Sequence, residues 1–108
     1  MDLNVLVLPC ETIARPYLKH IEDYTYRSGQ AIVNGLIQPL DIEATKTTVW
    51  CNEEGLPLGL PFNRRATAYL YEHAPEHRGF NVLMGDVYFT GLPDEDGNPT
   101  SVPEEVVQ

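Results

Sequence analysis

Asn4-Val5-Leu6-Val7-Leu8-Pro9 is a short, almost wholly apolar stretch that ends at a proline. A run of this kind is typical of a β-strand that is buried on both faces, because a strand with one solvent face alternates apolar and polar residues. The stretch therefore predicts a strand at the centre of a sheet, and the segments that follow supply the other strands.

Three of those segments lie in the first half of the chain. Residues 15–21 alternate loosely, which predicts a second, more exposed strand. Residues 36–42 alternate like a strand and residues 46–51 are rich in β-branched and aromatic side chains, so we expect the two to pair as a hairpin. Pro39 has no backbone N–H to donate, which places its strand at a sheet edge or at a bulge. The last strands are expected over residues 80–83 and 86–90.

Two helices are expected between the strands. Residues 22–34 carry apolar side chains at helical spacing, and Gly35 follows where a glycine commonly ends a helix. A second helix opens at Asn63 and ends before Pro75, because the residue that precedes a proline resists helical backbone geometry.

The chain of 108 residues has room for one domain. We predict a single α+β domain over residues 1–93, with a twisted sheet of four to five strands, mixed or antiparallel, and two helices packed on one face. Residues 94–108 hold five acidic side chains and no basic one, which predicts an acidic C-terminal tail. Within this tail, Ser101 followed by Glu104 is a capping-box pattern that predicts one turn of helix.

The balance of charge argues against direct contact with nucleic acid. Sixteen acidic side chains against seven basic ones give a net charge of −9, and phosphate backbones repel such a surface. No apolar run approaches the roughly 20 residues of a membrane-spanning helix. The N-terminal Met1-Asp2 lacks the basic residues of a secretory signal, so we expect a cytoplasmic location. Cys10 and Cys51 form no C-x-x-C motif and are expected to be reduced.

Longer motifs indicate a family resemblance. Residues 50–67, WCNEEGLPLGLPFNRRAT, resemble the central signature of the domain of unknown function 3846 family, and residues 84–91, MGDVYFTG, resemble its closing strand. Residues 5–9 and 30–37 are similar to its first strand and to its helix-to-strand junction. At that junction Asn34 stands where the family usually has the first glycine of a pair, and asparagine tolerates the same left-handed backbone.

The resemblance implies a context and no particular chemistry. Proteins of this family occur in bacteria, in their phages and in mobile elements as small accessory products, and the family as a whole has no assigned activity. The resemblance therefore supplies no catalytic residue, metal or cofactor for this chain.

Asn63-Arg64-Arg65 is the most informative local feature for function. The first turn of a helix has unpaired N–H groups and a partial positive charge, so arginines there are unfavourable unless something compensates. One explanation is an anion site, in which two guanidinium groups and the helix N-terminus hold phosphate, a nucleotide or the carboxylates of a partner. The other explanation is a structural cluster of ion pairs with Glu53 and Glu54 on the preceding turn.

Two tyrosines extend this candidate surface. Tyr69 shares the buried face of the second helix, and Tyr71 lies off that face. Exposed tyrosines are typical of interaction surfaces, although they also cover the edges of small cores with the hydroxyl in water. The predicted surface combines the loop and helix start over residues 56–65 with these tyrosines, and its candidate binding residues are Asn63, Arg64, Arg65, Tyr69 and Tyr71.

No residue pattern supports catalysis or metal binding. His73 and His77 have the spacing of helical metal ligands, but Pro75 breaks the helix between them. The acidic loop that precedes Asn98 does not fit an EF-hand, because Leu92 and Pro103 would occupy ligand positions. We therefore expect no enzyme activity, no catalytic residue, no metal and no cofactor.

Three functions follow, in order of preference. The first is a non-enzymatic binding protein, an accessory product of a phage or mobile element that acts in the host cytoplasm by contact with a host protein. The second is a counter-defence protein that sequesters a nucleotide or another small anion at Arg64 and Arg65. The third is mimicry of nucleic acid by carboxylates, which is weakened because so many of them lie in the tail. The partner and the oligomeric state stay open.

Overall fold

The computed structural model describes residues 1–107 and contains a five-stranded antiparallel sheet. The strand order is β2-β1-β5-β4-β3, and each pair of neighbours runs antiparallel. The predicted α+β class is confirmed. The strands are β1 (Leu3–Leu8), β2 (Tyr17–Ile21), β3 (Ile37–Ile42), β4 (Thr47–Asn52) and β5 (Val87–Gly91).

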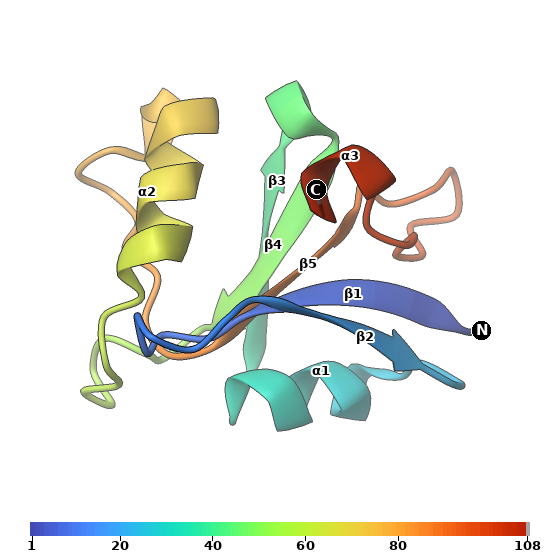
Figure 1. Cartoon of the computed structure of the whole chain (residues 1–108), viewed down its shortest axis with the longest axis horizontal. Helices are drawn as coiled ribbons and strands as arrows, with labels where there is room; N and C mark the ends of the chain where they lie inside the picture. Colours follow the sequence, from blue (N-terminus) through green and yellow to red (C-terminus); the bar gives the residue numbers. More distant parts are fainter. Residues whose placement is uncertain (108) are drawn as a thin grey trace.

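β1 is an interior strand, but β5 lies at the centre of the sheet. Leu3, Val5 and Val7 of β1 are buried on one face, and Leu8 is buried on the other. β5 is also buried on both faces, so the sequence pattern alone does not show which of β1 and β5 is the central strand. The sheet consists of two hairpins, β1–β2 and β3–β4, that are joined by the last strand of the chain (Figure 1).

Helices cover both faces of the sheet (Figure 1). α1 (Tyr26–Val33) packs on the face that carries Tyr88, and α2 (Arg64–His73) packs on the opposite face, which carries Val87 and Phe89. The prediction that both helices lie on one face is therefore wrong. The physical reason is that successive residues of β5 are apolar, so a cover on one face would leave the other face in water.

The core on the α1 face centres on Tyr88. Its ring stacks on Trp50 with the ring centroids 5.9 Å apart, and its hydroxyl lies 2.6 Å from the hydroxyl of Tyr24. Burial raises the pKa of Tyr88, and the hydrogen bond with Tyr24 raises it further, so the phenol stays protonated. A Cβ at Gly29 would overlap the Tyr88 hydroxyl. The close approach of α1 to the sheet therefore requires glycine at position 29.

α1 is shorter than the predicted helix over residues 22–34, because a side-chain cap defines its start and a left-handed residue defines its end. The Ser28 hydroxyl accepts a hydrogen bond from the Thr25 backbone N–H at 3.1 Å, which fixes the start of the helix. At the other end Asn34, and not Gly35, adopts the left-handed conformation, with φ of 61°. Gly35 is required for space, since a Cβ there would lie 2.5 Å from the side-chain nitrogen of Asn52.

The two edge strands, β2 and β3, carry residues that discourage pairing with another chain. Pro39 lies in β3, so its predicted position at an edge is confirmed. The exposed Lys19 places a charge in β2. The predicted hairpin is also confirmed as β3–β4, in which Leu40 lies opposite Val49.

Residues 80–83 do not form the predicted strand and instead run beside α2. The Thr67 hydroxyl accepts the backbone N–H of Leu83 at 3.0 Å, and the Asn63 backbone N–H donates to the Leu83 carbonyl at 2.8 Å. The start of α2 thus takes the backbone groups that a neighbouring strand would need. Gly85, with φ of 77°, then turns the chain into β5.

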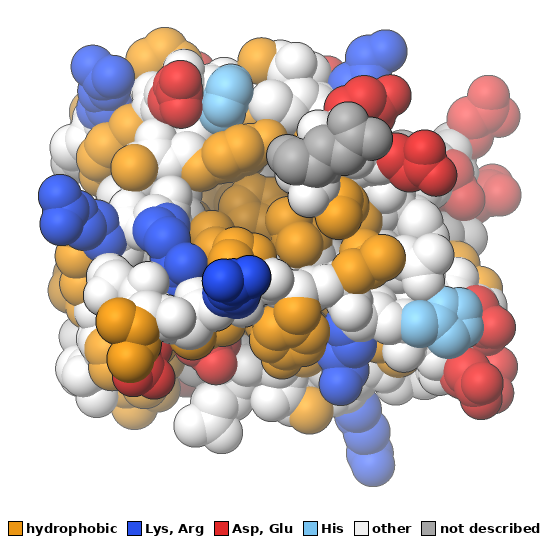
Figure 2. All heavy atoms as spheres, viewed as in Figure 1, with side chains coloured by type: hydrophobic (Ala, Val, Ile, Leu, Met, Phe, Trp, Pro, Cys, Tyr) orange, Lys and Arg blue, Asp and Glu red, His pale blue; other side chains and the backbone are white. Residues whose placement is uncertain are grey.

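The acidic C-terminal segment is anchored to the domain as far as residue 107. Val102 is 7% exposed in the core of the α2 face, and its N–H donates to the Asn4 carbonyl at 2.9 Å. One turn of helix, α3 (Glu104–Val107), lies in this segment, but it begins after the predicted capping box, because the Ser101 hydroxyl accepts the Asn4 backbone N–H instead; residue 108 lies outside the described residues. Figure 2 shows acidic side chains gathered toward the right side of the view. Five carboxylates of the segment are exposed: Asp94, Glu95, Asp96, Glu104 and Glu105.

Two 3-10 turns complete the connections. η1 (Glu43–Thr45) joins β3 to β4, and η2 (Pro75–His77) follows α2 almost directly. Within residues 1–107, no helix combines the length and the apolar character needed to cross a membrane.

Candidate functional site

Asn63 begins α2 from a fully buried position. Its side-chain oxygen accepts the Ala66 backbone N–H at 3.1 Å, which caps the helix. Its side-chain nitrogen donates to the carbonyls of Leu8 and Gly85, both at 2.9 Å. One amide therefore joins the start of α2 to the end of β1 and to the turn before β5. Asn63 is among the predicted binding residues, but it has no surface with which to contact a ligand.

Arg65 is half-buried, and its guanidinium is bonded to the backbone. Its Nη2 donates to the carbonyls of Pro9 and Glu11, at 2.9 and 3.0 Å. Its Nε is buried and has no hydrogen-bond partner among the described residues. The guanidinium holds the β1–β2 connection against the first turn of α2, and the carbonyl dipoles compensate for a cation at the positive end of a helix.

Arg64 is exposed, and it does not belong to an ion-pair cluster. Across residues 1–107, no carboxylate of Glu53 or Glu54 lies within 4.0 Å of either arginine side chain. The structure therefore does not show the predicted alternative of ion pairs with these two glutamates. Because Arg65 is bonded to the backbone, only Arg64 remains of the proposed site with two guanidinium groups.

Replacing the two arginines should separate their roles. We expect Arg65→Ala to lower the free energy of unfolding by about 1–2 kcal/mol, because two charge-assisted hydrogen bonds to carbonyls are lost. Arg64→Ala, one position away on the surface, should change it by less than about 0.5 kcal/mol. Urea unfolding measures both values, and equal stabilities of the two variants would contradict a structural role for Arg65.

The two tyrosines of α2 are half-buried and differ in their surroundings. Tyr71 donates its hydroxyl to the Asn81 carbonyl at 2.8 Å, which ties α2 to the segment that follows it. Tyr69 packs edge-on against Phe89, with the ring centroids 5.2 Å apart, and lines a pocket beside α2. The predicted site is therefore divided between the interior, the surface and this pocket.

Asn52 resembles Asn63 in its structural role. Its side-chain nitrogen donates to the carbonyls of Val33 and Asn34, at 3.1 and 3.2 Å. Its side-chain oxygen accepts the Glu54 backbone N–H at 2.8 Å. Asn52 thus fastens the end of α1 to the turn after β4. Both asparagines of the 50–67 motif satisfy backbone groups of the interior, as buried polar side chains commonly do.

The two asparagines stand at the ends of a loop over residues 54–62. The loop turns on itself through a hydrogen bond from the Leu60 backbone N–H to the Gly55 carbonyl, at 3.0 Å. Glycine is needed at position 55, because a Cβ there would lie 2.9 Å from the Cβ of Met84. The signature therefore specifies a fixed loop that packs against the segment before β5.

Large apolar side chains from two segments are exposed where the loop meets residues 80–84. Figure 1 shows both segments at the left end of the molecule, and an isolated β-bridge between Phe62 and Met84 joins them. An exposed apolar patch of this kind marks an interaction surface, because water contact with it is unfavourable. We call the following five residues the apolar end: Leu56 (64% exposed), Leu58 (61%), Phe62 (49%), Phe80 (84%) and Val82 (44%).

A groove of about 160 Å³ lies within the apolar end. Leu56, Phe80 and Val82 line it, together with Gln38 and Leu40 of the edge strand β3. Small-molecule sites have volumes of about 300–1,000 Å³. The groove is smaller and has polar as well as apolar lining, so it suits a single side chain of a partner better than a free ligand.

Family membership follows from a match over almost the whole chain. Residues 3–108 match the model of the family described as Domain of unknown function (DUF3846). The chain belongs to the DUF3846 family. The resemblance carried by residues 50–67 and 84–91 is thereby confirmed. No curated protein and no solved structure gives a match.

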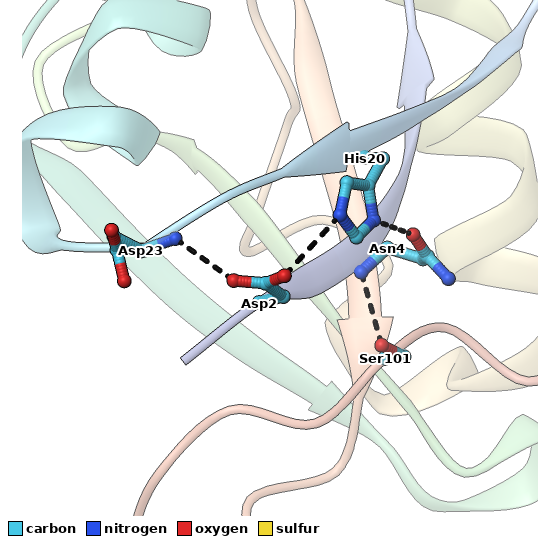
Figure 3. Close-up of polar contacts among 5 residues, drawn as sticks. All are labelled: Asp2, Asn4, His20, Asp23 and Ser101. Atoms are coloured by element: carbon cyan, nitrogen blue, oxygen red, sulfur yellow. Dashed lines mark hydrogen bonds and ion pairs between the residues drawn. The ribbon is translucent and has the colours of Figure 1, made fainter.

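At the end opposite the apolar end, this DUF3846 chain brings a serine, a histidine and an aspartate together (Figure 3). His20 lies 2.7 Å from Oδ1 of Asn4 through Nδ1, and 3.5 Å from the Asp2 carboxylate through Nε2. The Ser101 hydroxyl accepts the Asn4 backbone N–H at 3.0 Å, and Asp2 accepts the Asp23 backbone N–H at 3.2 Å. The Ser101 hydroxyl is therefore hydrogen-bonded to a backbone amide. The cluster ties the N-terminus to β2 and to the C-terminal segment.

Neither cysteine of the DUF3846 chain is an activated nucleophile. Burial raises the pKa of the Cys51 thiol to about 11. Burial and the neighbouring Asp86 also raise the pKa of Cys10. Because the thiolate is the reactive form, these shifts disfavour the reactive state of both groups.

The two histidines of the α2 region do not form a metal site. α2 ends at His73, and η2 begins at Pro75, so His73 and His77 lie on different elements, as the proline predicts. His77 instead contacts Asn81 through Nδ1 at 2.8 Å. Over the described part of the chain, no three His, Cys, Asp or Glu side chains are grouped as metal ligands would be.

Proposed function

We propose that this DUF3846 chain is a non-enzymatic binding protein that contacts a partner protein through the apolar end. The exposure of Leu56, Phe80 and their neighbours carries the proposal. A large apolar side chain contributes on the order of 1.5–3 kcal/mol when contact removes it from water. The buried amides of Asn52 and Asn63 support the proposal, because a backbone that is fixed before contact loses little conformational freedom on binding.

We further propose that the partner is a protein of the host cell and that the chain is an accessory product of a phage or mobile element. The context in which the family occurs motivates this part of the proposal. The net charge of −9 favours a protein over a nucleic acid as the partner. The groove favours a partner that inserts a single side chain beside β3.

The two alternatives have less support. An anion site at Arg64 and Arg65 loses one of its guanidinium groups to the carbonyls of Pro9 and Glu11. Mimicry of nucleic acid requires rows of carboxylates, and no observation at the apolar end favours it. Deletion of the acidic segment is not a clean test of mimicry, because the deletion would also remove Val102 from the core.

The double variant Leu56→Ser, Phe80→Ser should lose the partner and keep its fold. Both side chains are mostly exposed, so we expect the free energy of unfolding to change by less than about 1 kcal/mol. The wild-type chain is immobilised and incubated with extract of its host cell, and the retained protein is identified, purified and titrated against each variant by calorimetry. We expect the affinity to fall at least about tenfold, because central apolar anchors dominate binding energy.

Leu18→Ser on β2 is the matched control, because Leu18 is 53% exposed and lies outside the apolar end. Its affinity for the partner should stay within about twofold of the wild type. The proposal fails if no protein is retained specifically, or if the control and the double variant bind equally well.

A further inference from the structure

A second concave region lies on the α2 face, outside the apolar end. The pocket has a volume of about 600 Å³ and is bordered by α2, η1 and α3. Figure 2 shows this face hollowed between α2 and the C-terminal segment, with apolar side chains inside the hollow. The volume falls within the range of about 300–1,000 Å³ for small-molecule sites.

One wall of the pocket is aromatic and the opposite wall is aliphatic. Tyr69 and His73 lie one turn apart on α2, with ring centroids 4.4 Å apart, and both line the pocket. Phe89 packs against the back of Tyr69, which fixes this wall to the sheet. Pro103 and Val106 line the other side. The two rings are tilted by 50°, so a flat ligand ring can lie against the face of one of them and against the aliphatic carbon of the other side.

Lys46 stands at the η1 end of the pocket. Its backbone is held on both sides, since its N–H donates to the Glu43 carbonyl at 3.1 Å and its own carbonyl accepts the Leu92 N–H at 3.2 Å. In the described residues, no carboxylate lies within ion-pair distance of its ammonium group.

The polar groups of the lining are mostly donors. Lys46, the Tyr69 hydroxyl and the His73 ring can donate, although His73 Nε2 also lies 3.7 Å from the Glu72 carboxylate, and Glu105 is the one carboxylate of the lining. A ligand with acceptor oxygens therefore finds more partners here than a ligand with donors. The Glu105 carboxylate repels an anion. Whether removal of this carboxylate strengthens or weakens binding therefore shows the sign of the charge that a bound molecule places near it.

We propose that this pocket binds a small, flat aromatic molecule that carries a negative charge and has the size of a mononucleotide. The ring lies between the aromatic pair Tyr69 and His73 and the aliphatic Val106, and the anionic group lies toward Lys46. The pocket shares no residue with the apolar end, so this inference does not depend on the proposed partner protein.

Nuclear magnetic resonance with adenosine 5′-monophosphate as the probe tests the inference on the full-length, isotope-labelled chain. We expect saturable shifts at the backbone amides of Lys46, Tyr69 and His73, and none at Leu56. Lys46→Gln should weaken binding about fivefold, and Glu105→Gln should strengthen it about twofold, because the first removes an attraction and the second a repulsion. Adenosine without its phosphate should bind more weakly than the monophosphate.

Lys19→Gln is the matched control, because it removes the same charge from β2 and should leave the affinity within about twofold. The inference is overturned if no saturable shift occurs up to about 10 mM probe, or if the shifts fall outside the pocket. It is also overturned if Lys46→Gln binds as well as Lys19→Gln, or if Glu105→Gln weakens binding, which would indicate a cationic group at the site.

Discussion

Asn63→Ala is expected to lower the free energy of unfolding by about 3–7 kcal/mol. The change removes the cap of α2, which contributes about 1 kcal/mol. It also leaves the carbonyls of Leu8 and Gly85 without their donor, and each such loss in a buried place costs about 1–3 kcal/mol. Small domains are stable by only about 5–15 kcal/mol in total. Urea unfolding followed by circular dichroism measures the change.

Two further variants show which function of the Asn63 amide matters. Asn63→Asp keeps the capping oxygen but cannot donate to the two carbonyls and buries a carboxylate, so it should destabilise the protein at least as much as alanine. Asn98→Ala, in an exposed loop, should change the free energy of unfolding by less than about 0.5 kcal/mol. A loss below about 1 kcal/mol for Asn63→Ala would show that the amide does not hold the interior together.

Gly29→Ala is expected to destabilise the protein by about 3 kcal/mol, although alanine is the better helix former by about 1 kcal/mol. The new Cβ would overlap the Tyr88 hydroxyl and would lie 3.1 Å from the hydroxyl of Tyr24. Tyr88 cannot move aside freely, because Trp50 stacks on its ring and Tyr24 binds its hydroxyl. Either α1 leaves the sheet or the ring leaves its rotamer. Thermal and urea unfolding give the size and the sign of the effect.

A double-variant cycle with Tyr88→Phe tests the cause. Removal of the hydroxyl opens the space that the new methyl group needs, so the two changes together should cost at least about 1 kcal/mol less than the sum of their separate effects. The close packing of α1 on Tyr88 is contradicted if the two effects add, or if Gly29→Ala stabilises the protein as helix propensity alone predicts.

Much of the fold could be predicted because it depends on local patterns. The apolar run before Pro9 gives β1, and the β-branched segment before Asn52 gives one strand of the β3–β4 hairpin. Pro75 ends α2, and Pro39 marks an edge strand. In each case the residue's own backbone chemistry decides the outcome, so no distant contact has to be known.

The features that were predicted wrongly depend on contacts between distant segments. Residues 80–83 have the composition of a strand, but Thr67 and Asn63 bind the backbone of Leu83 and direct the segment along α2. α1 and α2 lie on opposite faces because β5 buries side chains on both faces of the sheet, and each face needs a cover. Sequence patterns indicate which residues are buried. They do not indicate which helix covers which face of the sheet.

The candidate site was predicted in part. Asn63 and Arg65 stand out in the sequence, but the sequence does not show that carbonyls from residues 8–11 and 85 engage their side chains. The loop over residues 56–65 belongs to the predicted surface, whereas Phe80 and Val82 were missed because residues 80–83 were predicted to form a strand. Leu56, Leu58 and Phe62 lie in a glycine- and proline-rich loop that no regular element can contain, and apolar side chains in such a loop have little core to enter.

Hydrogen–deuterium exchange of the wild-type chain, alone and with the protein that it retains from host extract, tests most directly whether the apolar end is the contact surface. We predict that binding slows exchange in residues 54–62 and 80–84 and leaves residues 94–107 unchanged. Slower exchange confined to residues 94–107 or to α1, with residues 54–62 unaffected, would contradict the assignment of the apolar end as the binding surface.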